Sequence, residues 1–173
     1  MKTRNANDRL TGLLTLLDRL EWMHRELLDV IRDKIEKMRS SNLDGMRDCI
    51  TREAALVQEV TEQEGLRRQL MVSLGQEMGI APHQARTLNV RELARRVDAS
   101  RREPLLAAAD RLRGTAAQVA EANRVAGLIA REILRHFRHV FAAMTCLENG
   151  PGGYTPRGQR QTAAGQKLLD AVG

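Results

Sequence analysis

The sequence predicts an all-α protein, and its composition and apolar spacing support this. Aromatic residues make up only 2% of the 173 residues, whereas β-domains fill their strands with aromatic and β-branched side chains. Leu, Ala, Arg, Glu and Gln are abundant instead, and these are good helix formers. Apolar residues also recur at steps of three and four along three long segments, which is typical of one helix face. We therefore expect an elongated antiparallel bundle of three long helices plus one short helix, with a flexible C-terminal tail.

The first helix is expected from about residue 7 to residue 39. Its apolar face consists of Leu10, Leu13, Leu17, Leu20, His24, Leu27, Ile31 and Met38. The polar run 40–42 ends the pattern, and Asn42 is suited to cap the next helix because its side chain can accept a backbone hydrogen bond.

The second helix is expected over residues 43–78. Its predicted inward positions are Met46, Ile50, Glu53, Val57, Val60, Glu64, Arg67, Met71, Leu74 and Met78. Three of these ten are charged, so this helix is the least apolar of the three. Gly79 and Pro82 predict its end, and residues 79–89 are expected to form a loop.

Two capping patterns follow the loop. Asn89 with Glu92 predicts the start of a short helix that ends near Val97. Ser100 with Glu103 repeats the pattern and predicts the start of the third long helix.

The third long helix has the most regular pattern in the chain. Steps of four and three alternate without a fault through Leu105, Ala109, Leu112, Ala116, Val119, Asn123, Ala126, Ala130, Ile133, Phe137, Val140 and Met144. This heptad spacing keeps an apolar stripe against a partner helix. Asn123 is the only polar residue in the stripe, and we expect it to be buried and to fix the register of packing.

The composition changes near residue 148. Six Gly and Pro residues fall within positions 150–158, a density that breaks helices and predicts a flexible linker. Leu168, Leu169 and Val172 then form a small apolar cluster. We therefore expect a helical body over residues 1–147 and a tail over residues 148–173.

Charge and cysteine content exclude several classes of protein. The formal net charge is +6, and the basic residues are scattered rather than gathered into the patch or arm typical of nucleic-acid binders. The two cysteines, Cys49 and Cys146, belong to no metal-binding spacing. The sequence shows no signal peptide and no stretch long and apolar enough to insert into a membrane. Neither nucleic acid nor membrane is an expected partner.

Candidate catalytic and metal-binding residues have simpler interpretations. Glu21 and His24 form one E-x-x-H spacing, whereas di-iron bundles need two copies, so a partly buried helix-face histidine is expected. His136 and His139 lie among three arginines, which oppose cation binding. Phosphate-binding and nucleophile motifs are absent from the sequence. We expect no catalytic, cofactor-binding or metal-binding residue; a chorismate-mutase-like enzyme, which needs inward Arg and Lys such as Lys34, remains a remote alternative.

The order of several short motifs resembles one protein family. A Leu-rich first helix precedes a helix with a Glu- and Arg-rich stretch at 61–68. A Leu-x-x-x-x-Leu-Ala element follows at 88–94, an Asn-containing stretch at 121–128 and a Tyr-x-Pro-x-Gly motif at 154–158. In this order the chain resembles the FlgN-type flagellar export chaperones, although Ala126 stands where the family often carries a second Asn.

The resemblance implies a cytoplasmic, non-enzymatic chaperone for type III export. Such proteins hold unassembled hook–filament junction proteins, of the FlgK and FlgL type, and deliver them to the flagellar export apparatus. The family docks cargo through its C-terminal part, which implies a partner-binding role for Tyr154, Pro156, Gly158, Leu168, Leu169 and Val172, with Phe137, Phe141 and Met144 as a second candidate surface. A coiled-coil scaffold unrelated to export remains an alternative.

Overall fold

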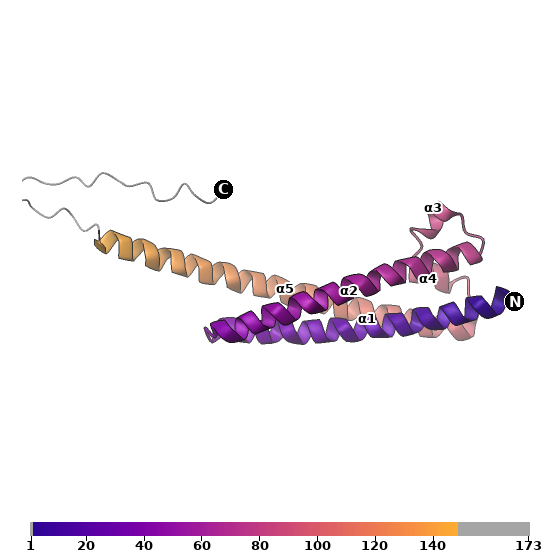
Figure 1. Cartoon of the computed structure of the whole chain (residues 1–173), viewed down its shortest axis with the longest axis horizontal. Coiled ribbons are helices and arrows are strands. Elements are labelled where there is room, and N and C mark those ends of the chain that lie inside the picture. Colours follow the sequence, from indigo (N-terminus) through magenta and orange to yellow (C-terminus); the bar gives the residue numbers. More distant parts are fainter. Residues whose placement is uncertain (1, 149–173) are drawn as a thin grey trace, which may run out of the picture. The chain divides into compact units, whose positions relative to one another are not determined.

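A computed structural model describes the backbone of residues 2–148 and the side-chain environments of residues 7–145. The described residues form helices α1 (Lys2–Arg39), α2 (Leu43–Glu77), α3 (Pro82–Ala85), α4 (Val90–Ala94) and α5 (Ala99–Glu148) (Figure 1). This confirms the all-α prediction and the three long helices. The short helix α3 is additional, because it lies in the segment predicted as a loop. None of the described helices is long and apolar enough to cross a membrane.

The chain divides into two compact units, residues 1–129 and residues 130–173, called here the N-terminal and C-terminal units. The N-terminal unit contains α1 to α4 and most of α5. The C-terminal unit contains the remainder of α5. The predicted tail, apart from Glu148, lies outside the described residues, so its predicted flexibility stays a prediction.

The turn between α1 and α2 reverses the chain within three residues. Ser41 adopts a positive φ of 55°, and the Asn42 side chain accepts a hydrogen bond of 2.9 Å from the backbone N–H of Gly45. This is the predicted N-cap. Figure 1 shows α1 and α2 side by side and antiparallel.

Two glycines permit the tight connection after α2. Gly79 has a φ of +77°, which L side chains rarely adopt. Gly75 is buried, and a Cβ at this position would lie 3.0 Å from the Cβ of Ala85. The absence of a side chain at Gly75 therefore lets α3 pack closely on α2.

The caps of the last two helices show one correct and one wrong prediction. Asn89 and Glu92 form a capping box at the start of α4, as predicted. Ser100 does not cap α5, because that helix begins one residue earlier, at Ala99. The backbone carbonyl of Asp98 accepts the N–H groups of Arg101 and Arg102, each at 3.0 Å.

Two apolar clusters stabilise the N-terminal unit. The first joins α1, α2, α4, α5 and the connection between α4 and α5. Its buried members are Leu10, Leu13, Leu17, Met71, Leu74, Val90, Leu93, Val97, Leu105 and Ala108. The second joins α1 and α5, and its buried members are Leu27, Leu28, Ile31, Ile35, Val119 and Ala126. α2 contributes Leu56 only as a partly buried neighbour of the second cluster. α1 therefore packs against α2 and against α5 within this unit.

The hydrogen-bonded pairs between α1 and α5 follow the same order along both helices. Arg101 donates to Thr11 at 2.9 Å, and farther along Thr115 donates to Glu21 at 3.2 Å. α1 and α5 consequently run parallel, with an offset that stays between 90 and 94 residues.

Asn123 is exposed, contrary to the prediction that it is buried. The inward positions in this part of α5 are Val119, Ala122 and Ala126. Ala108 and Thr115 are buried and Ala122 packs against the second cluster, seven residues apart, so this row of the repeat lies one position before the predicted Ala109, Ala116 and Asn123. Asn123 therefore does not fix the register of packing.

The predicted inward positions of α2 are also partly wrong. Ile50 is 50% exposed and Val57 is 47% exposed, whereas Cys49 is buried and Leu56 is half-buried. Between Cys49 and Met71 no residue of α2 is buried. The three charged residues among the predicted inward positions, Glu53, Glu64 and Arg67, are half-buried. This agrees with shallow packing of this stretch of α2.

We predict that Leu93→Ala destabilises the protein by about 2–5 kcal/mol, the usual range for truncating a buried leucine. Leu93 is fully buried in the first cluster. Leu66→Ala, at a site that is 50% exposed, is the matched control and should change the free energy of unfolding by less than about 0.5 kcal/mol. Urea unfolding measures both; equal losses would show that α4 does not pack into the core.

We predict that Cys49 reacts slowly with thiol reagents in the folded protein. Burial raises the pKa of the Cys49 thiol, and its hydrogen bond to the Asp33 carboxylate raises it further. A raised pKa leaves less thiolate at pH 8, and the thiolate is the reactive form. A Cys146→Ser protein should therefore be labelled more than about tenfold faster in urea than in buffer. Equal labelling rates would contradict the buried position.

Candidate functional site

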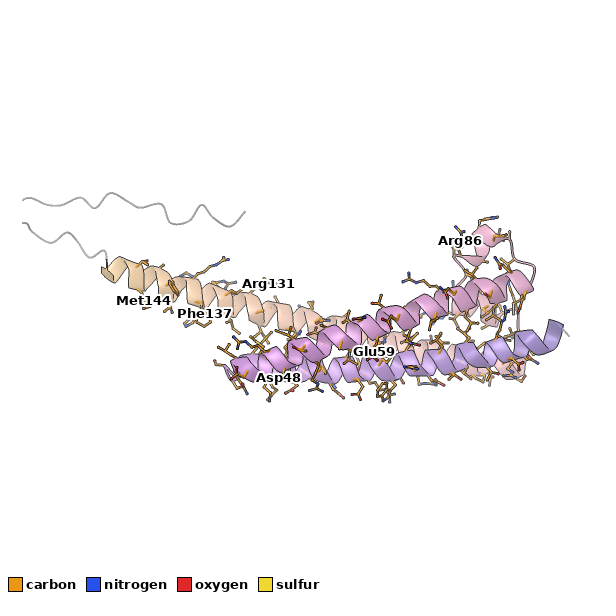
Figure 2. All side chains as sticks on the ribbon, viewed as in Figure 1. Asp48, Glu59, Arg86, Arg131, Phe137 and Met144 are labelled. Atoms are coloured by element: carbon orange, nitrogen blue, oxygen red, sulfur yellow. The ribbon has the colours of Figure 1, made fainter. Side chains whose placement is uncertain are left out.

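The C-terminal part of α5 carries a row of exposed apolar side chains. Leu134, Phe137, Val140, Phe141 and Met144, called here the C-terminal α5 face, are between 41% and 69% exposed. Their spacing of three and four residues places them on one side of the helix. Figure 2 shows Phe137 and Met144 as sticks on this part of α5.

The exposed apolar residues of the chain are concentrated here. Eleven large apolar side chains are exposed among the described residues, and six of them lie between Leu128 and Met144. Scattered exposed apolar residues are normal on a protein surface, whereas a contiguous patch indicates an interaction site. The C-terminal α5 face is therefore the strongest candidate for partner binding.

The buried positions of α5 end close to the point where, in the register of the two helices, α1 ends. Among the side chains of α5 that the structure describes, Ala126 is the last that is buried. α1 ends at Arg39, and both helices rise by about 1.5 Å per residue, so this register pairs the end of α1 with the end of the N-terminal unit's part of α5. The heptad pattern nevertheless continues to Met144.

The polar side of the same helical stretch is predominantly basic. Arg131, Arg135 and Arg138 are exposed, and Glu132 forms an ion pair of 2.8 Å with Arg135. His136 and His139 are exposed as well. Among the residues with described side chains, no group of three or more His, Cys, Asp or Glu could hold a metal ion. This stretch is thus an amphipathic helix with a basic polar side.

The E-x-x-H pair of α1 has a structural role. Glu21 is buried, accepts from Thr115, and forms an ion pair of 2.5 Å with Arg25. His24 is half-buried, and its Nδ1 lies 2.7 Å from the carbonyl oxygen of Leu20. The predicted partly buried helix-face histidine is confirmed.

Lys34 forms an ion pair with Glu53 between α1 and α2. The side chains are 11% and 18% exposed, respectively. Lys34 is the basic residue on which the mutase-like alternative depended, and its ammonium group already has a carboxylate partner. The arrangement therefore joins two helices rather than presenting a free cation to a substrate.

The structure brings together one of the two predicted groups of partner-binding residues. Phe137, Phe141 and Met144 share the C-terminal α5 face. The tail group, consisting of Tyr154, Pro156, Gly158, Leu168, Leu169 and Val172, lies outside the described residues. Leu134 and Val140 were missed as site residues, because only their exposure on this face distinguishes them from buried positions.

Comparison with known proteins adds one finding. A family model described as FlgN protein matches residues 1–162 of the chain. No curated protein and no solved structure matches the chain.

We predict that Lys34→Met destabilises the protein by about 1–3 kcal/mol, because it leaves the largely buried carboxylate of Glu53 without its partner. The double substitution Lys34→Met with Glu53→Leu should recover most of this loss, since it removes both charges. Urea unfolding of the two single variants and the double variant completes the cycle. If the loss of stability in the double variant equalled the sum of the losses in the two single variants, the ion pair would be contradicted.

Proposed function

Because the chain belongs to the FlgN family, a family of flagellar export chaperones, we propose that it binds unassembled hook–filament junction proteins of the FlgK and FlgL type. Its role is to keep this cargo from assembling before export. The match covers residues 1–162 and so includes all five helices. FlgN is a chaperone family rather than an enzyme family, which supports a function that depends on binding and not on catalysis.

The exposed C-terminal α5 face is the observation that supports this proposal. A chaperone needs a stable helical body together with an apolar surface that remains available to its cargo. The two buried clusters supply the stable body. Phe137 and Phe141 are 59% and 69% exposed, and aromatic side chains of this kind contribute much of the energy of protein interfaces.

The mode of recognition that fits this face is the packing of amphipathic helices. An apolar row at helical spacing matches the apolar face of another helix. The cargo should therefore present a helix whose apolar residues cover Phe137, Phe141 and Met144. Transfer of these residues out of water provides the driving force, at about 25 cal/mol for each Å² buried.

We propose the segment 148–173 as a second contact with the cargo. Its Tyr154, Pro156 and Gly158 match the tail motif of the family. Leu168, Leu169 and Val172 add apolar residues that fit the same purpose. The family also implies cytoplasmic action and delivery of the cargo to the flagellar export apparatus.

We predict that the triple variant Phe137→Ser, Phe141→Ser, Met144→Ser binds a purified hook–filament junction protein at least about tenfold more weakly. Its melting temperature should be unchanged, because all three side chains are exposed. The matched control is Leu43→Ser, Ile50→Ser, Val57→Ser, which removes three comparably exposed apolar side chains from α2 and should retain affinity. Titration calorimetry measures binding, and circular dichroism measures melting.

Deletion of residues 148–173 tests the tail separately. Lost affinity with unchanged melting supports a docking role for the tail. Full affinity would reject that role and leave the C-terminal α5 face as the cargo site. If the wild-type protein does not bind the junction protein at all, the coiled-coil scaffold becomes the better interpretation.

A further inference from the structure

The N-terminal unit contains a cavity, and none of its lining residues belongs to the C-terminal α5 face. Its volume is about 800 Å³, within the range of pockets that hold ligands. α1, α2, α4, α5 and the connection between α3 and α4 line it. Apolar side chains, among them Leu17, Met71 and Leu112, form part of the lining.

Arginines dominate the charged part of this lining. The cavity is lined by Arg67, Arg68, Arg86, Arg91, Arg95 and Arg113, and by only two acidic residues, Glu64 and Glu92. We call it the arginine cavity. The six arginines are separated by up to 46 positions in the sequence, and the fold brings them together around one cavity.

Both acidic residues of the lining already have hydrogen-bond partners. Glu64 accepts two hydrogen bonds of 3.0 and 3.1 Å from Nε of Arg67 and a further bond from its Nη2. Glu92 accepts from the backbone N–H of Asn89 in the capping box. Neither carboxylate is therefore available to neutralise the other arginines of the cavity.

Three of the six arginines have no ion pair among the residues whose side chains the structure describes. Arg91 and Arg113 pair with Asp110, at 2.8 and 3.7 Å. Arg68, Arg86 and Arg95 make no such pair. They come from α2, from the residue after α3 and from the residue after α4; Figure 2 shows Arg86 beside α3.

Several guanidinium groups around one cavity repel each other, and an anionic ligand would relieve that repulsion. Guanidinium groups bind carboxylates with two parallel hydrogen bonds, which gives both strength and orientation. The apolar part of the lining adds a place for an aliphatic side chain. The arginine cavity is thus complementary to a ligand that combines several carboxylates with apolar groups.

We propose that the arginine cavity binds an acidic peptide segment of a partner protein. Asp or Glu side chains of the segment pair with Arg68, Arg86 and Arg95, and an apolar side chain of the segment packs on Leu17, Met71 and Leu112. This site goes beyond cargo capture, because none of its residues belongs to the C-terminal α5 face.

Two other occupants fit the cavity less well. Single-stranded nucleic acids are held by basic grooves with aromatic side chains on which bases stack. No Phe, Tyr or Trp lines this cavity, and its one imidazole is that of the half-buried His24. The chain's own segment 149–173 carries three basic residues, Arg157, Arg160 and Lys167, but only one acidic side chain, Asp170. Its charge therefore has the wrong sign.

The test uses a random-peptide display library selected on the full-length Phe137→Ser, Phe141→Ser, Met144→Ser protein, so that the C-terminal α5 face does not capture peptides. The selected peptides are then synthesised and their affinities measured by fluorescence anisotropy. The cavity variant is Arg68→Gln, Arg86→Gln, Arg95→Gln, made in the same background. Its matched control, Arg19→Gln, Arg39→Gln, Arg96→Gln, removes the same charge from exposed arginines that do not line the cavity.

We expect the selected pool to be enriched in Asp and Glu together with aliphatic residues. Affinity should fall by about tenfold or more in the cavity variant and by less than about twofold in the control. It should also weaken as salt is raised. The three arginines make no described ion pair, so the melting temperature should not change.

Four results would overturn the proposal. The first is a pool without acidic enrichment, and the second is equal loss of affinity in both variants. The third is displacement of the peptide by phosphate or citrate at equal concentration, which would assign the cavity to a small anion. The fourth is tighter binding of a single-stranded RNA oligonucleotide that is lost in the cavity variant, which would assign it to nucleic acid.

Discussion

The packing of α5 along α1 sets the limit of the buried core. The two helices run parallel with a nearly constant offset, and their apolar contacts continue to Ile129. α1 then ends at Arg39, where the turn through Ser41 reverses the chain. The apolar pattern of α5 is longer than this partner, and its remaining part is exposed. The candidate cargo surface is therefore the exposed apolar part of α5 that follows its packed stretch.

Polar contacts between the two apolar clusters fix the register on which this limit depends. The buried Glu21 accepts from Thr115 across the α1–α5 interface. A shift by one residue would separate the two groups and leave a buried carboxylate without this partner, which is costly. Lys34 and Glu53 serve a similar purpose between α1 and α2. These polar pairs, rather than Asn123, are the register-determining features of the bundle.

The sequence predicts those features of the fold that depend on local interactions. The caps at Asn42 and Asn89 involve only the first turn of the following helix, so they could be read directly. The exposure of Asn123 could not be predicted, because positions 122 and 123 both fit steps of three and four between Val119 and Ala126, and only packing against α1 selects Ala122. The exposure of Phe137 and Phe141 could not be predicted either, because their spacing continues that of the buried positions of α5. The arginine cavity was missed for a similar reason, since Arg68, Arg86 and Arg95 form no motif in the sequence.

Hydrogen exchange along α5 tests most directly the claim that the uncovered stretch binds cargo. In the free protein, amides of residues 105–126 should exchange slowly because their side chains are packed in the two clusters, and amides of residues 131–145 should exchange rapidly because none of their side chains is buried. Addition of a hook–filament junction protein should slow exchange in residues 131–145 specifically. Equally slow exchange over both stretches in the free protein, or cargo protection confined to other helices, would contradict the account.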